Sequence, residues 1–155
     1  RVSWKCNLKS CLHEGALVHT FRHMLVSYMY DCPQLHSALL ERLRGRGAFT
    51  LRAILDDQKL SKEASANQTR MAKELKAAGG KIWLARGAKG RGQYNGSCHM
   101  KCLAIDGRIA YSGGANWTDA ASKNLDLVFR FTGQPVADIY HALKIVLSEW
   151  TVKQI

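Results

Sequence analysis

Long apolar runs are missing from this chain of 155 residues, although 46% of the residues are hydrophobic. No run approaches the roughly 18 consecutive apolar residues that a membrane-spanning helix requires. A regular disulfide pattern is missing too, because the five cysteines are an odd number without clear pairing. We therefore expect one soluble domain with reduced thiols in an intracellular compartment. The start at Arg1, without an initiator methionine, is expected of an excised domain and leaves the localisation open.

Acidic residues are scarce, with 12 Asp and Glu against 23 Lys and Arg, which gives a formal net charge of +11. Such a balance suits phosphate-rich partners, either nucleic acid or an anionic membrane surface. A basic surface that is merely solvated is the alternative at this point. The charge alone does not choose between them.

Residues 1–20 show little periodicity, and we expect an irregular N-terminal segment before a domain that spans residues 21–155. Cys6, Cys11 and His13 have the residue types of a zinc site but lack a persuasive second pair of ligands. Ordinary buried or exposed side chains are the favoured interpretation of this cluster.

The pattern from residue 22 onward alternates between strand and helix. The expected elements are a strand at 22–30, a helix from Pro33 to Arg44, a strand at 49–55, a helix at 61–78 and a strand at 81–85. This order builds parallel strands with helices packed on the sheet. Residues 86–97 predict a loop rich in glycine and positive charge.

The second half of the chain predicts a hairpin, a further strand and a helix. Strands at 98–105 and 108–112 are separated by Asp106-Gly107, a pair favoured in tight turns. A strand at 125–131 follows, and a terminal amphipathic helix extends to Trp150.

His99 and Lys101 are expected on the same side of their strand, because side chains alternate between the two faces. Cys98, Met100 and Cys102 would then point to the other side. Taken singly, each polar residue of this region has an ordinary interpretation: a structural histidine at His99, a turn at Asp106, a helix cap at Asn116.

Together these residues resemble a known signature. His99-x-Lys101, four residues, Asp106, six residues and Gly113-Gly114-x-Asn116 are similar to the HKD motif of the phospholipase D superfamily. The resemblance covers roughly residues 22–152 and is strongest to the branch with a single motif, which includes small bacterial endonucleases and mitochondrial phospholipase D-like nucleases. It implies a mixed, mostly parallel α/β sheet with helices on both faces, no cofactor, a homodimer, and a mitochondrial surface as one location.

The resemblance also implies roles for the site residues. His99 of one protomer would attack phosphorus while the His99 of a second protomer protonates the leaving oxygen, with Asp106 completing the motif. Lys101 and Asn116 would hold the phosphoryl oxygens. An acid would hold the other ring nitrogen of the histidine, and Asp126 is the candidate, with Glu149 as the alternative.

The sequence departs from the family pattern at two of these positions. Relatives usually have glutamate about one residue beyond Asp126, and they commonly have serine where this chain has Gly114. We expect Gly113 and Gly114 to approach the phosphate, with the backbone amide of Gly114 donating to it.

The surroundings of the motif favour nucleic acid, single-stranded above all, over phospholipid. Basic and aromatic side chains suited to a polyanionic strand precede the motif at Arg86, Lys89, Arg91 and Tyr94, and others follow the first helix at Arg42, Arg44 and Arg46. The alternatives are a phospholipase D or cardiolipin hydrolase, which would need an apolar rim, and an inactive dimeric module that binds nucleic acid.

Overall fold

The computed structural model describes residues 21–27, 29–45, 49–57, 66–87 and 96–155. In chain order its elements are β1 (Phe21–Ser27), β2 (Tyr30–Asp31), α2 (Pro33–Arg44), β3 (Phe49–Asp56), α4 (Ala66–Ala77), β4 (Lys81–Ala85), β5 (Lys101–Ile105), β6 (Ile109–Gly113), β7 (Trp117–Thr118), η3 (Asp119–Lys123), β8 (Val128–Thr132), α5 (Gln134–Ile145), η4 (Val146–Trp150) and β9 (Thr151–Gln154). The predicted alternation of strand and helix up to β4 is confirmed, and α2 begins at Pro33 as expected.

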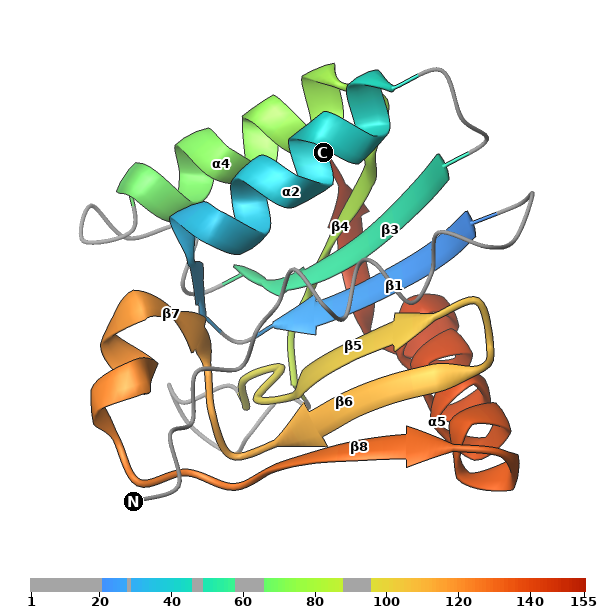
Figure 1. Ribbon diagram of the computed structural model, residues 1–155. Coiled ribbons are helices and arrows are strands. Elements are labelled where there is room, and N and C mark those ends of the chain that lie inside the picture. The colour runs from blue at the N-terminus through green and yellow to red at the C-terminus, as the bar shows by residue number, and fades with distance from the viewer. Residues whose placement is uncertain (1–20, 28, 46–48, 58–65, 88–95) are drawn as a thin grey trace.

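The sheet is mixed, as predicted, but it is not mostly parallel. Seven strands lie in the order β8-β6-β5-β1-β3-β4-β9 (Figure 1). Only the pairs β1–β3 and β3–β4 are parallel, whereas the other four pairs are antiparallel. The reason lies in the connections: α2 carries the chain from β1 to β3, α4 carries it from β3 to β4, and a tight turn after β5 reverses it. A second sheet pairs β2 with β7.

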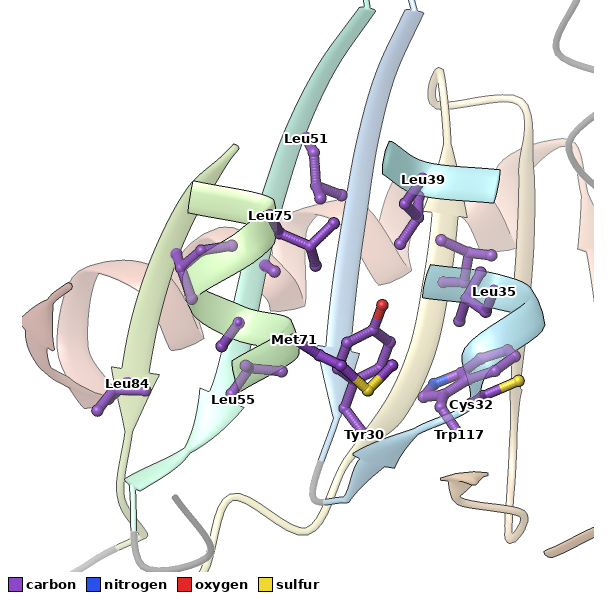
Figure 2. Packing of buried hydrophobic residues seen from close by; sticks show 14 of the residues in the cluster. Tyr30, Cys32, Leu35, Leu39, Leu51, Leu55, Met71, Leu75, Leu84 and Trp117 are labelled. Carbon is purple, nitrogen blue, oxygen red and sulfur yellow. The ribbon is translucent and has the colours of Figure 1, made fainter. Parts of the chain in front are cut away.

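Helices cover both faces of the large sheet, which confirms the predicted layering. Figure 1 shows α2 and α4 together on one side and α5 on the other. Strand alternation divides the apolar side chains accordingly, since Leu51 and Leu55 of β3 join the cluster under α2 and α4 while Ile54 joins the cluster under α5. Figure 2 shows the first cluster, where Leu39 of α2 and Leu75 of α4 are fully buried. Burying such a side chain stabilises the fold by about 1.5–3 kcal/mol.

The C-terminal region differs from its prediction. The expected helix extending to Trp150 is α5 followed by a π-helical turn, η4, and the chain then adds β9 to the edge of the sheet beside β4. A four-residue strand has too short a pattern to recognise in the sequence. Among the described residues, no helix combines the length and apolar character needed to cross a membrane.

Candidate active site

His99 and Lys101 lie side by side at the start of β5. His99 is exposed, whereas Lys101 is only 6% exposed. Lys101 Nζ lies 2.8 Å from His99 Nδ1 and 3.1 Å from Nε2, and it donates to the His99 carbonyl oxygen at 2.9 Å. Because an ammonium can only donate hydrogen bonds, the ring nitrogen that faces it accepts with its lone pair. The pair therefore places an imidazole directly beside a positive charge.

The predicted division of side chains between two faces is confirmed. Cys98 and Cys102 are buried in the cluster under α5, and Met100 packs against that cluster. His99 and Lys101 point the other way. The strand itself begins at Lys101 rather than at residue 98, because the pairing with β1 ends where Ser27 meets Lys101.

A buried carboxylate anchors the segment that carries His99. Asp56, the last residue of β3, is fully buried, and its Oδ2 accepts from the Cys98 amide at 2.7 Å. The bond reaches across the end of β1, which lies between β3 and β5 in the sheet. Sequence reasoning missed Asp56, although an acidic pair closing the apolar strand 49–55 was a signal for it.

Arg86, a predicted substrate-binding residue, is engaged by other residues of the fold. Its guanidinium forms an ion pair with Asp57, and its backbone amide donates to the Trp150 carbonyl oxygen at 3.1 Å. The arginine therefore ties β4 to the end of β3 and to η4. Asp57 is a buried acid, and Arg86 supplies its counter-charge.

Gly113 and Gly114 connect β6 to the site, and each lacks a side chain for a different reason. A Cβ at Gly113 would lie 2.0 Å from the Leu127 carbonyl oxygen, so the pairing of β6 with β8 requires glycine. A Cβ at Gly114 would lie 2.9 Å from Asp126 Oδ1. Asp126 thus occupies the space beside Gly114.

The amide of Gly114 is not available to an oxyanion, contrary to the sequence-based expectation. It donates to the Leu127 carbonyl oxygen at 3.0 Å. This hydrogen bond continues the contact between β6 and the segment leading into β8. The glycine serves the site by leaving room for the carboxylate.

Asp126 and burial act in opposite directions on Lys101. Removal from water lowers the pKa of Lys101 below its ordinary value of 10.5, and the negative charge of Asp126 opposes that fall. The register supports this proximity, because Ser112 lies opposite Cys102 and its hydroxyl donates to the Lys101 carbonyl oxygen at 3.1 Å. The two residues after Ser112 therefore lie beside Lys101.

Asn116 lies at the same end of the sheet, and both polar atoms of its side chain can accept further hydrogen-bonding partners. Its Nδ2 makes a long contact of 3.9 Å to the sulfur of Met29, which lies just beyond β1. Its Oδ1 is buried and has no hydrogen-bond partner within the described residues. Asn116 directly precedes β7, and it does not cap η3, whose N-cap is Thr118.

A buried polar network supports the small sheet that follows Asn116. Tyr30 of β2 pairs with Trp117 of β7, and the Tyr30 hydroxyl lies 3.2 Å from His36 Nδ1. His36 Nε2 lies 2.7 Å from Glu74 Oε2 on α4. Hydrogen bonds from His36 and then Arg70 lower the pKa of Glu74, while burial raises that of Tyr30. The network links α2 and α4 to the strand beside Asn116.

Asp106 does not join the site, so its predicted catalytic role is corrected. It lies in the turn at the far end of β5, about 16 Å along the strand from Lys101. Its φ of 54° and that of Gly107, 68°, place both residues in the left-handed region that a tight hairpin turn requires. The Arg108 amide closes the turn by donating to the Ile105 carbonyl oxygen at 2.9 Å.

Arg42 and Arg44 are also remote from His99. Arg42 and Arg44 lie at the end of α2, which leads into the start of β3. That start is level with the Ile105 end of β5, because β1 pairs in parallel with β3 and antiparallel with β5. They therefore lie at the turn end of the sheet.

The other predicted residues are placed as follows. Glu149 is exposed on η4, which packs on β4, and Asp126 is the acid whose charge reaches Lys101. Lys89, Arg91, Tyr94 and Arg46, and the N-terminal Cys6, Cys11 and His13, lie outside the described residues. Within the residues that are described, no group of three or more His, Cys, Asp or Glu side chains could hold a metal ion.

Solved structures share this fold at low sequence identity. NucT from Helicobacter pylori matches with a TM-score of 0.76 and 17% identity over 93% of this chain and 89% of that one. Nuc from Salmonella typhimurium, a phospholipase D family member, matches at 0.73 and 12% over 96% and 90%. A polyphosphate kinase from Porphyromonas gingivalis matches at 0.64 and 17% over 88% of this chain and 23% of its own.

No curated protein sequence matches this chain. A family model described as "Cardiolipin synthase, PLD-like domain" matches residues 19–144. That range contains His99, Lys101, Asn116 and Asp126. Since the match spans most of the 155 residues, the chain belongs to the phospholipase D-like domain family.

Proposed function

We propose that this protein is a phosphodiesterase that cleaves nucleic acid without a metal, through a phosphohistidine intermediate in a site shared by two copies. The observation that supports it most is the exposed His99 ring held 2.8 Å from the Lys101 ammonium. A phosphate entering the site would draw Lys101 to its non-bridging oxygens. The ring nitrogen released from that contact would then have its lone pair available for attack.

The reaction needs two imidazoles. The His99 nitrogen forms a bond to phosphorus as the bond to the leaving oxygen breaks, and an acid gives that oxygen a proton. Water then attacks the phosphohistidine, returns a proton to the second imidazole and restores the first. One His99 cannot be nucleophile and acid in the same step, so a second copy supplies the other ring.

Three further side chains support this chemistry. Lys101 offers its positive charge to the phosphoryl oxygens, and Asn116 has an amide Nδ2 whose described contact, to a thioether, is weak. The carboxylate of Asp126 stabilises the charged form of Lys101 and can compensate positive charge on a phosphorylated ring. The low exposure of Lys101 strengthens each of these interactions relative to water.

Nucleic acid is the favoured substrate because of charge. A net charge of +11 attracts a polyanion over its whole length, whereas a single phospholipid headgroup uses only part of such a field. The shared fold with NucT and Nuc is compatible with this choice. We propose single strands above duplexes, since an exposed site on one sheet end reaches a flexible backbone most easily.

Phospholipid is the second candidate, and one observation favours it. The site has the apolar rim that a lipid substrate would need, because Leu125 is 98% exposed and Leu127 is 61% exposed on either side of Asp126. The leucines form this rim without help from Trp117, which is buried, or Trp83, which is half-buried.

The test is cleavage of labelled single- and double-stranded DNA and RNA in excess EDTA, with a phosphatidyl substrate in parallel. Wild type should cleave nucleic acid, and His99→Ala should not. Trapping the enzyme by acid-free denaturation should reveal a labelled strand joined to His99 through its phosphate. Lipid turnover alone would replace the nuclease with a phospholipase, and binding without turnover in both proteins would leave an inactive binding module.

A further inference from the structure

Positive charge in the described part of the chain gathers at the end of the sheet opposite His99. This region, the turn end, consists of the last turns of α2 and α4, the first residues of β3 and β4, and the turn between β5 and β6. Figure 1 shows the end of α2, the start of β3 and the β5–β6 turn together on the right of the view, away from β7. The cations of the turn end are Arg42, Arg44, Arg52, Lys76, Lys81 and Arg108.

The two ends of the sheet carry opposite balances of charge within the described residues. The acids near the six cations of the turn end are Glu41, Asp106 and, at the start of α5, Asp138. Around His99 the acids outnumber the cations Arg86, Lys101 and Lys123. They are Asp31, Asp56, Asp57, Asp119, Asp126 and Glu149. The strongest described positive field therefore lies away from the site.

Arg52 and Lys81 show that this charge is not offset within the fold. They are register partners on the neighbouring strands β3 and β4, and both are exposed. Like charges side by side on two strands destabilise a sheet. Neither residue forms an ion pair within the described residues, whereas Arg70 and Arg86 each meet an acid. A local cost of this kind is expected where a ligand supplies the opposite charge.

Helix ends account for only half of the cluster. Arg42, Arg44 and Lys76 lie in the last turns of α2 and α4, where a positive charge also stabilises the helix dipole. Arg52, Lys81 and Arg108 lie on strands or in the turn and have no such role. Three strand intervals, about 14 Å, separate the β5 end that carries the turn from β4. These cations therefore cover a width that suits several phosphates rather than one.

Nucleic acid fits the turn end better than a membrane does. Four of the six cations are arginines, whose guanidinium groups pair with phosphate through two hydrogen bonds. A membrane-binding surface would also present exposed apolar side chains. The large hydrophobic residues that are exposed all lie elsewhere; they are Leu125, Leu127, Phe129, Ile145 and Trp150.

We propose that the turn end is a second nucleic-acid-binding surface, separate from the site, that holds the phosphate backbone by charge. The inference rests on the proposed function for its ligand class, but binding can be measured without turnover. About 16 Å of β5 separates Lys101 from the turn, so a long strand can reach both ends of the sheet while a small diester reaches the site alone. Engaging both ends should strengthen binding of long substrates and leave the chemistry unchanged.

The binding experiment compares two pairs of substitutions in a His99→Ala background, by fluorescence anisotropy of labelled poly(dT). Arg52→Gln/Arg108→Gln changes the turn end, and Lys73→Gln/Lys144→Gln removes the same charge from exposed residues of α4 and α5 outside it. The turn-end pair should raise Kd about tenfold, and the control less than about twofold. The slope of log K against log NaCl concentration should become shallower by about 1.4 in the turn-end pair, or 0.7 for each lost phosphate contact. Equal changes in both pairs would reduce the effect to net charge and overturn the proposal.

The fold of the turn-end pair is checked by its melting temperature. Removing Arg52 relieves its repulsion from Lys81, so the Tm should equal or exceed that of wild type. A large fall in Tm would show instead that the two arginines are structural, and would overturn the proposal.

Turnover by chains that retain His99 separates this surface from the proposed function. The turn-end pair should raise KM for a long strand about tenfold at constant kcat, and should hydrolyse bis(p-nitrophenyl) phosphate as wild type does. A wild type without turnover whose binding still depends on the turn end would refute the proposed function and support this surface. Nucleic-acid cleavage with equal binding in the two pairs would do the reverse. Flotation with phosphatidylglycerol vesicles that only the turn-end pair loses, at unchanged nucleic-acid affinity, would assign the surface to a membrane and overturn the proposal.

Discussion

Replacing Gly114 by alanine should move Asp126 and reduce turnover without unfolding the protein. The added Cβ would lie 2.9 Å from Asp126 Oδ1, while ordinary contacts begin at 3.4 Å, so the carboxylate must move by about 0.5 Å (3.4 − 2.9). The atom that moves is the end of a side chain, which can rotate. A misplacement of 1 Å costs on the order of a hundredfold in rate, so half of it should cost about tenfold.

Stability should change little in this variant. Turning the Asp126 side chain away from its preferred rotamer costs about 0.5–1.5 kcal/mol. Replacing glycine restricts the unfolded chain and returns about 0.4–1 kcal/mol, because the backbone at Gly114 has no positive φ. The two effects largely cancel, so the Tm should shift by less than about 4 °C.

Gly113→Ala is the control for this experiment. Its Cβ would meet the Leu127 carbonyl oxygen at 2.0 Å and Val128 Cα at 2.8 Å, and backbone cannot rotate away. We expect a loss of about 2–3 kcal/mol in stability, seen as a fall of roughly 5–10 °C in Tm.

A double-mutant cycle decides whether Asp126 transmits the effect of Gly114→Ala. In an Asp126→Ala background no carboxylate remains to be displaced, so the added alanine should cost little further activity. The assay is hydrolysis of bis(p-nitrophenyl) phosphate with kcat and KM measured separately. A tenfold loss in both backgrounds would show that Asp126 is not the mediator and would refute the reasoning.

Three other predictions concern the pH response, the anchor and the turn. Because burial lowers the pKa of Lys101, the alkaline limb of the pH profile of kcat should begin below pH 10.5. Asp126→Asn should move this limb to lower pH, because it removes the negative charge that opposes the effect of burial. A limb that stays in place in this variant would contradict the prediction. Between the folded and the unfolded pKa of Lys101 the unfolded chain binds the extra proton, so stability measured by urea unfolding should rise with pH there. Asp56→Ala should lower kcat at least tenfold, because it releases the Cys98 amide. Asp56→Asn keeps an acceptor oxygen for that amide and should retain most of the turnover. Equal losses in the two variants would indicate that the negative charge of Asp56 matters instead of the hydrogen bond. Asp106→Asn should keep the kcat of wild type, since asparagine adopts the left-handed turn conformation readily, and a large loss would return Asp106 to the site.

Local patterns in the sequence were sufficient for most of the fold. The start of α2 at Pro33 and the extent of β4 follow from a fixed proline φ and from five apolar-rich residues bounded by glycine and arginine. The mostly parallel sheet was wrong, because the directions of β8 and β9 depend on which strand each finds as a neighbour. Short edge strands have too few residues for periodicity to reveal that choice.

The candidate site was likewise predicted only in part. Alternation along one strand correctly paired His99 with Lys101, and that inference needed only the pleat of the backbone. Asp106 was misassigned, and the ion pair of Arg86 with Asp57 was not foreseen, because a motif lists residues in order but does not say where a strand ends or which acid a cation meets. Asp56 was missed since its role depends on Cys98, which is 42 residues away in the sequence.

The two departures from the family pattern form one structural feature. A serine at position 114 would place its Cβ against the Asp126 carboxylate, so the present position of Asp126 is compatible only with glycine there. Conversely, an aspartate is shorter than glutamate, and its carboxylate occupies the space that a side chain at position 114 would fill. From there its negative charge opposes the effect of burial on the pKa of Lys101. Neither Gly114 nor Asp126 then indicates a degraded site. Restoring serine alone should therefore harm activity, even though it restores the commoner residue.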